Sequence, residues 1–183
     1  MENDANRPTL LLHACCAPCA PHIFNTLSDK YSVAVYFYNP NIQPETEYIA
    51  RKNEIIKFSE QAGFKLIVGE PDSTGWNEAI KGYEPDPEGG ERCRLCFRHR
   101  LEHTAREAAQ LNFDFFATTL SISPHKNAKI INEEGSLAAS KYGLRFLEAD
   151  FKKRNGFKIS CELSREHGFF RQDYCGCLFS RRD

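Results

Sequence analysis

Short apolar runs alternate with longer amphipathic segments along residues 9–147, and this alternation limits the fold more than any other feature of the chain. The short runs are rich in β-branched and aromatic residues and stop at turn-forming residues, which predicts strands. The longer segments repeat apolar residues at helical spacing. Strands that alternate with helices form βαβ units with a parallel sheet. The predicted strands are 9–14, 32–38, 65–68, 114–120 and 144–147, and the predicted helices are 18–29, 45–62, 93–111 and 127–142.

The chain length and the break in its pattern predict the domain organisation. A length of 183 residues suits one domain with a sizeable buried core. Beyond Asp150 the periodic pattern gives way to a basic stretch that we expect to pack over an edge of the sheet. We therefore predict a single domain over 1–183, with an α/β core over 1–150 and a basic, cysteine-containing extension over 151–183.

The composition excludes several classes of protein. Apolar residues make up 41% of the chain, too many for a disordered protein, and no apolar run is long enough to span a bilayer. The first residues lack the basic-then-apolar layout of a signal peptide, so we expect a cytoplasmic protein without a membrane partner. In that reducing compartment we expect the eight cysteines to be metal ligands or redox thiols rather than a disulfide framework.

Two cysteine motifs stand at predicted helix starts. Cys15, Cys16 and Cys19 follow the first strand, where ligands bind in open parallel sheets. Cys93 and Cys96 open a later helix, and a helix N-terminus favours the thiolate that binds metal. Together the motifs predict a thiolate metal centre, either zinc or iron–sulfur. The adjacent Cys15 and Cys16 favour iron–sulfur modestly, because zinc ligands are usually spaced by two to four residues.

A third pair, Cys175 and Cys177, encloses a single glycine. A disulfide across one residue is strained and therefore easily reduced, and Gly176 permits the unusual backbone that it needs. We favour a redox-active dithiol, with two further metal ligands as the alternative. Cys161 stands alone, and we interpret it as a small buried apolar residue.

The net charge of −1 conceals an uneven distribution. Residues 1–90 carry 7 basic and 13 acidic residues, whereas residues 91–183 carry 17 and 12. A basic half favours contact with a polyanion, and solvated arginines that pair with acids are the alternative. Tyr38, Phe97 and Tyr174 are candidates for stacking an unpaired base, unless they belong to the core. The arginines nearest the second cysteine motif are Arg92, Arg94, Arg98 and Arg100.

Six unusual stretches, spread over nearly the whole chain, carry a resemblance to a known family. They are LLHACCAPC (11–19), YNPNIQPETEYIAR (38–51), RCRLCFRHRL (92–101), ATTLSISPHKN (117–127), DFKKRNG (150–156) and RQDYCGC (171–177). In this order they resemble the epoxyqueuosine reductases of the QueH family. Cys161 lies outside all six stretches, so we carry no family role onto it.

The resemblance implies the last step of tRNA queuosine biosynthesis. Epoxyqueuosine at the wobble position of the tRNA anticodon would be reduced to queuosine, by two-electron removal of the epoxide oxygen. It also implies a three-layer α/β core of the HUP (adenine-nucleotide α-hydrolase) type. The electron donor is not identified by the residues. A proton donor is needed as well, for which His13, Lys126 and Asp173 are candidates.

The resemblance also assigns site residues. The family's 4Fe–4S cluster ligands match Cys15, Cys16, Cys93 and Cys96. Its redox-active dithiol matches Cys175 and Cys177. A second metal beside the cluster, an additional iron, would draw ligands from Cys19, Asp150 or Asp173.

Two other functions remain open on the residues alone. The stretch 16–19, a CxxC between a strand and a helix, also fits a thiol–disulfide oxidoreductase. A zinc-stabilised RNA-binding module would use the same cysteines as ligands. ATP, NAD and flavin are not predicted, because ACCAPC takes the place of a glycine-rich phosphate loop and no GxGxxG is present. Metal identity separates the three functions: iron with sulfide, zinc, or no metal.

Overall fold

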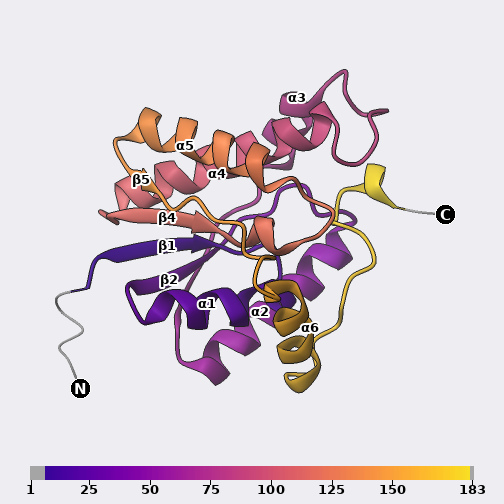
Figure 1. Cartoon of the computed structure of the whole chain (residues 1–183). Helices are drawn as coiled ribbons and strands as arrows, with labels where there is room; N and C mark the ends of the chain where they lie inside the picture. The colour runs from indigo at the N-terminus through magenta and orange to yellow at the C-terminus, as the bar shows by residue number, and fades with distance from the viewer. Residues whose placement is uncertain (1–6, 182–183) are drawn as a thin grey trace.

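The computed structural model describes residues 7–181 as a five-stranded sheet between two layers of helices (Figure 1). All neighbouring strands are parallel, in the order β3-β2-β1-β4-β5. The predicted parallel α/β fold is therefore confirmed. The strands are β1 (Thr9–His13), β2 (Ser32–Phe37), β3 (Lys65–Val68), β4 (Phe115–Thr118) and β5 (Arg145–Phe146).

The helices cover both faces of the sheet. In Figure 1, α4 and α5 lie above the sheet, and α1 and α2 lie below it. Within residues 7–181, none of the helices has both the length and the apolar character needed to cross a membrane. The α-helices are α1 (Ala20–Ser28), α2 (Glu45–Ala62), α3 (Ser73–Ile80), α4 (Glu91–Gln110), α5 (Ala128–Tyr142) and α6 (Gly156–Glu166), and the short 3-10 helices are η2 (Ala17–Cys19), η3 (Thr119–Ile122) and η4 (Leu178–Ser180).

The central strand β1 explains why the sheet needs cover on both faces. Leu10 and Leu12 belong to the core cluster that α1 and α2 complete, and Leu11 belongs to the cluster beneath α4 and α5. All three leucines are fully buried. A leucine buried in this way contributes about 1.5–3 kcal/mol relative to an exposed one, so a continuous apolar run is stable only in the middle of a three-layer fold.

The strand order reverses between β1 and β4, and this reversal positions the first cysteine motif. The chain leaves β1 toward β2 on one side of the sheet, and it leaves β4 toward β5 on the other. The two loops diverge and open a crevice at the carboxyl ends of the strands, where ligands bind in such folds. Thr119, just after β4, accepts a hydrogen bond from the backbone N–H of Cys15 at 3.2 Å.

Two helices that the sequence pattern did not predict are α3 and α6. The eight-residue α3 buries only Trp76 and Ile80. In α6 the buried residues after the first turn are Ser160 and Ser164, which a search for apolar periodicity does not detect. The expected position of the C-terminal stretch over a sheet edge is wrong: α6 packs against α1 and η2, and Ser160 donates a hydrogen bond to the Pro18 carbonyl at 2.9 Å.

Candidate thiolate and metal centre

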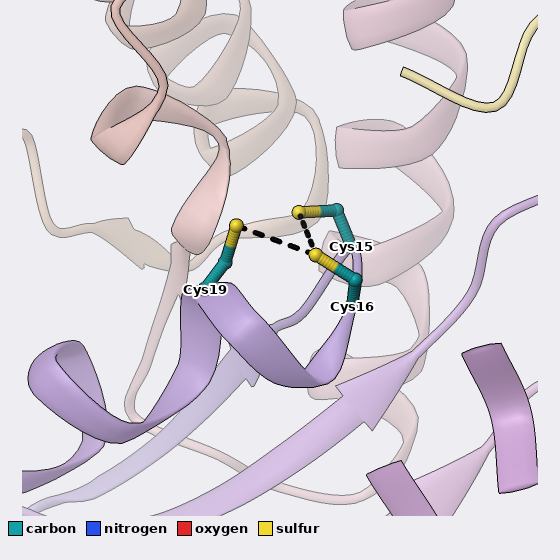
Figure 2. Close-up of side chains that lie close together, drawn as sticks. All are labelled: Cys15, Cys16 and Cys19. Carbon is teal, nitrogen blue, oxygen red and sulfur yellow. Dashed lines mark hydrogen bonds between the residues drawn. The ribbon is translucent and has the colours of Figure 1, made fainter. Parts of the chain in front are cut away.

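Cys15, Cys16 and Cys19, here called the cysteine triad, point toward one another at the end of β1 (Figure 2). The sulfur of Cys16 lies 3.6 Å from that of Cys15 and 3.3 Å from that of Cys19, and all three lie within 4.8 Å of one another. Sulfurs around one tetrahedral ion with bonds of about 2.3 Å lie roughly 3.8 Å apart. The spacing and soft donors of the triad therefore suit a metal.

The local backbone brings the triad together. Cys16 precedes the single turn of η2 in extended conformation, and Cys19 ends that turn and precedes α1. Pro18 is suited to the first turn of a helix, because its missing N–H has no partner there. Because this turn is tight, Cys16 and Cys19 lie on the same side of it, and both border the large cavity in the crevice.

The triad stabilises one thiolate. Hydrogen bonds from the thiols of Cys16 and Cys19 lower the pKa of Cys15 well below its usual range, and the charges of Lys126 and Arg100 act in the same direction. The same contacts raise the pKa values of Cys16 and Cys19, because deprotonating either would bring a second negative charge beside the first. A thiolate flanked by two thiols is ready to receive a cation.

A second cysteine cluster forms from two segments far apart in the chain. It comprises Cys93 and Cys96 of α4 and the pair Cys175 and Cys177, which together line one small cavity. Cys96, Cys175 and Cys177 also pack with Trp76 and Ile80. A hydrogen bond from Cys177 lowers the pKa of Cys175, helped by Lys126 and by Ser180, whose hydroxyl lies 3.0 Å from the Cys175 sulfur. The pKa of Cys177 is raised by the same pairing. This cluster also stabilises one thiolate.

The loop that carries Cys175 and Cys177 is docked on the segment before α2. The backbone N–H of Gln43 donates to the Gly176 carbonyl at 2.8 Å, and the Tyr174 hydroxyl donates to the Gln43 carbonyl at 2.6 Å. The buried guanidinium of Arg51 donates to the carbonyls of Cys175 and Tyr174, both at 3.2 Å. These bonds hold the cysteine pair against the core.

Gly176→Ala is expected to destabilise this loop strongly. Gly176 has φ +108, and an added Cβ would lie 2.8 Å from Cγ1 of Ile42 and 3.2 Å from Nη1 of Arg51. We expect a loss of about 2–3 kcal/mol in the free energy of unfolding, from backbone strain and steric overlap together. Gly168→Ala is the control, because Gly168 also has positive φ but open space around it, so it should lose only about 1–2 kcal/mol. Equal losses in urea unfolding would show that the close approach is unimportant.

Two adjoining cavities connect the cysteines. The small cavity, with a volume of about 30 Å³, is lined by all four members of the second cluster. The large cavity, of about 200 Å³, is lined by the triad and by Cys161. The structure therefore brings both predicted cysteine motifs and the C-terminal pair to one region. The residues that line both cavities are Glu88, Arg100, His125, Lys126 and Cys175.

The two aspartates considered for a second metal lie in different places. Asp173 lines the large cavity together with the triad. Asp150 lines a separate cavity beside α5, and its Oδ1 lies 2.8 Å from Nζ of Lys152. Only Asp173 therefore borders the same space as Cys19.

The candidate proton donors also differ in position. His13 is fully buried and lines neither cavity, and burial, with the charge of Arg100, lowers its pKa to about 3. Its ring is therefore neutral at physiological pH. Burial alone would lower the pKa of Lys126, but the facing sulfurs of Cys175, Cys15 and Cys19 outweigh it and raise that pKa. Lys126 remains charged and faces both groups of cysteines.

The four arginines near Cys93 and Cys96 are either paired with an acid or buried. Arg94 and Arg98 both pair with the buried Glu134, at 2.6 and 2.8 Å, which ties α4 to α5. Arg92 and Arg100 are buried. For Arg94 and Arg98 the structure therefore agrees with the alternative interpretation, in which the arginines pair with acidic residues.

The aromatic candidates for base stacking are mostly part of the core. Tyr38 and Phe97 are buried, and the ring of Tyr38 stacks on His103 with centroids 3.6 Å apart. Tyr174 is half-buried and lines the large cavity. Phe97 borders the small cavity but is buried, so of the three only Tyr174 is both at the site and partly exposed.

Several residues around the cysteines were not among the site residues predicted from the sequence. Thr119 contacts the backbone and, at 3.5 Å, the sulfur of Cys15. Ser180 contacts Cys175, and Arg51 holds the loop before it. Serine, threonine and arginine are common throughout proteins, so only their position identifies them as part of the site.

Fold and site together define a parallel α/β protein with a thiolate centre, of the metal-binding or redox type, at the point where the strand order reverses. Comparison with known families identifies it more closely. The family profile described as epoxyqueuosine reductase QueH matches residues 10–183. The chain belongs to this family, as the six sequence stretches indicated, and it is an oxidoreductase.

Curated relatives support this membership over nearly the full chain. The epoxyqueuosine reductase QueH of Streptococcus pyogenes serotype M1 is 39% identical over 99% of this chain and 73% of its own length. That of Acinetobacter baylyi is 40% identical over 97% and 83%. That of Thermotoga maritima is 37% identical over 94% and 90%. The family match over residues 10–183 spans both cysteine clusters.

Solved structures confirm the type of fold. A predicted subunit of a tRNA methyltransferase from Methanocaldococcus jannaschii matches 91% of this chain and 93% of its own, with a TM-score of 0.59 and 12% identity. The U34-tRNA thiolase NcsA from Methanococcus maripaludis, with its [4Fe-4S] cluster, matches 97% of this chain and 62% of its own, with a TM-score of 0.60 and 13% identity. At such identities the likeness concerns the fold alone.

Proposed function

We propose that this chain reduces epoxyqueuosine in tRNA to queuosine at an iron–sulfur centre held in the cysteine-lined cavities. The observation that carries the proposal is the meeting of eight cysteines around two adjoining cavities, seven of them from the three segments with more than one cysteine. So many sulfurs beside buried cations suit a centre that exchanges electrons.

The proposed ligands of the 4Fe–4S cluster are Cys15, Cys16, Cys93 and Cys96. Their fit rests on donor chemistry: the pKa of Cys15 is lowered by its neighbours, and Cys93 lies at the start of α4, where the helix dipole favours negative charge although burial raises the pKa of its thiol. Cys19 and Asp173 border the same large cavity and are the proposed ligands of an additional iron. When bound, such a centre supplies electrons and a Lewis acid for the epoxide oxygen.

The pair Cys175 and Cys177 is proposed to supply the two electrons of each turnover. Removal of an epoxide oxygen consumes two electrons and two protons, and it yields an alkene and water. Oxidation of the Cys175 thiolate and the Cys177 thiol to one disulfide releases two electrons and one proton, and a separate proton donor supplies the second proton, so the two half-reactions balance. An external donor must then reduce the disulfide. Cys175, the thiolate of the pair, lines both cavities and so contacts the space shared with the triad.

Lys126 is the proposed proton donor to the departing oxygen. It lines both cavities, and within residues 7–181 its Nζ has no hydrogen bond or ion pair. A charged ammonium group that faces the site can donate a proton as the oxygen leaves. The neutral, enclosed His13 cannot fill this role, because it has neither a proton to spare nor access to the cavities.

The proposed partner is tRNA that carries epoxyqueuosine in its anticodon loop, and the proposed location is the cytoplasm. Recognition of a loop nucleotide requires an open site with donors for phosphate. The large cavity is bordered by Arg171 and by the half-buried Tyr174, which would meet the backbone and a neighbouring base. Binding should weaken as salt is added.

Metal content and product analysis test the proposal together. Protein purified without oxygen should contain about four acid-labile sulfides with about four irons, or about five irons when the additional iron is bound. Given a chemical reductant, it should convert epoxyqueuosine-containing tRNA to queuosine-containing tRNA, followed by mass spectrometry of the nucleosides. One zinc without sulfide, after cluster reconstitution, would contradict the proposal and support a zinc-stabilised RNA-binding module. Turnover by metal-free protein would support a thiol–disulfide oxidoreductase instead.

A further inference from the structure

Arg100 is a buried cation without an anionic partner in its immediate surroundings. Only 3% of its surface is exposed, and no carboxylate among residues 7–181 lies within ion-pair distance of its guanidinium. Glu88 borders the same two cavities, but its side chain is exposed to solvent. A buried charge is costly unless an opposite charge compensates it.

The neighbours of Arg100 satisfy little of its hydrogen-bonding capacity. Its Nη2 donates to Oδ1 of Asn39, and its Nε is buried without a partner. Its Nη2 also lies 3.4 Å from Nε2 of His13. That ring nitrogen is 3.1 Å from the Tyr38 carbonyl, which can only accept, so Nε2 carries the proton and is not an acceptor for Arg100.

The other ring nitrogen supports this assignment. Nδ1 of His13 lies 2.8 Å from the Thr118 hydroxyl, which also accepts the backbone N–H of Leu120 and so has its own proton free to donate to Nδ1. His13 is thus held neutral with its proton on Nε2. His13 therefore gives Arg100 neither a hydrogen-bond acceptor nor a negative charge.

Other buried arginines of the chain are compensated. Arg51, equally buried, pairs with the carboxylate of Glu47 at 2.7 Å. Arg92 donates to several backbone carbonyls, including those of Glu84 and Phe179. Arg51 borders the large cavity and Arg92 the small one, whereas Arg100 borders both and, in the described part of the chain, has neither a carboxylate nor a set of carbonyls around its guanidinium.

We propose that Arg100 is the buried counter-charge of the sulfur centre, a positioning residue that stabilises the negative charge of the cysteine thiolates and of the cluster they hold. The part that concerns the cluster rests on the proposed function; the part that concerns the thiolates does not. A fixed cation favours the reduced, more negative state of a neighbouring centre and so raises its reduction potential.

A metal-free double-mutant cycle tests the thiolate part. Arg100→Gln is made in the parent chain and in Cys15→Ser, and thermal unfolding is measured with a chelator and a reductant. We expect Arg100→Gln to lower the melting temperature by about 2–4 °C more in the parent than in Cys15→Ser, because the serine background lacks the thiolate. Arg98→Gln, which removes a charge from the same helix away from the cavities, should have the same effect in both backgrounds. Equal effects of Arg100→Gln in both would overturn the proposal.

A redox titration of the iron-loaded enzyme tests the cluster part. Arg100→Gln should reduce the ratio of reduced to oxidised centre at a fixed potential by about tenfold, a downward shift of about 59 mV for one electron. Arg100→Lys retains the charge and should keep the reduction potential close to that of the parent enzyme. Arg98→Gln should leave the potential unchanged. An unshifted potential in Arg100→Gln with full iron content would overturn this part. If the parent chain takes up no iron, the proposed function fails, and the metal-free cycle still decides the role of Arg100.

Discussion

Cys15→Ser is expected to abolish iron–sulfur binding and to reduce turnover of epoxyqueuosine-containing tRNA by roughly a thousandfold or more. Cys15 is the thiolate of the cysteine triad, with the thiols of Cys16 and Cys19 both arranged around it. Loss of a partner that only orients a metal ligand already costs about 10- to 100-fold. Loss of the ligand itself should cost more, because a serine hydroxyl stays protonated and is a poor donor to iron.

The matched control for this prediction is Cys161→Ser. Cys161 is partly buried and lines the same large cavity as the triad, but it stands alone on α6. Its replacement should change iron content and turnover by less than about twofold, in line with most substitutions outside special sites. Iron and sulfide analysis, with electron paramagnetic resonance of the reduced protein, checks both variants. Full iron content in Cys15→Ser, or its loss in Cys161→Ser, would contradict the assignment of the centre to the triad.

Cys175→Ser is expected to retain the metal centre and yet reduce turnover with a dithiol-dependent electron donor by at least about a hundredfold. The Cys175 thiolate is stabilised by Cys177, Lys126 and Ser180, so it is the sulfur of the pair that begins thiol–disulfide exchange. Cys177→Ser should have an effect of similar size, because one remaining sulfur cannot close a disulfide. Mass spectrometry of alkylated protein should find the disulfide between Cys175 and Cys177 in the oxidised parent chain.

A chemical reductant separates the two roles of the pair. If dithionite restores full turnover to both serine variants, the dithiol acts in electron supply alone. If dithionite restores neither, one or both sulfurs contact the centre or the substrate directly. Loss of iron from Cys175→Ser would contradict the redox assignment and favour the alternative that this pair binds metal.

Local patterns in the sequence predicted most of the secondary structure, because the physical requirements there are local. The continuous apolar run of β1 needs helices on both faces of the sheet, and it has them. Gly63 and Gly143 end α2 and α5 in left-handed conformation, with φ values of 71 and 68, as glycine after a helix predicts. The helix α6 was not predicted because the residues that it buries after its first turn are Ser160 and Ser164. Polar residues at buried positions produce no apolar periodicity in the sequence.

Part of the chemistry of the site could also be predicted from short sequence motifs. The spacing of the cysteines in 15–19 and 93–96, and their place at the start of a helix, predicted thiolate ligands. Family resemblance extended this to the whole reaction, because the six stretches keep their order along the chain. The acid that pairs with Arg94 and Arg98 could not be located from the sequence, because that acid, Glu134, lies on another helix.

Which sulfurs meet, and which charges face them, was decided only by the tertiary structure. The triad lies in the crevice because the strand order reverses beside β1, and the C-terminal pair joins Cys93 and Cys96 because Arg51 and Gln43 hold its loop. The role proposed for Arg100 depends on its burial and on the absence of a carboxylate near its guanidinium among residues 7–181, which only the tertiary structure shows. The sequence by itself determined the fold class and the family and indicated which cysteines could bind metal, since these depend on short motifs and their order. Long-range packing determined the grouping and the electrostatics of the site, because both depend on distances between segments that no local pattern records.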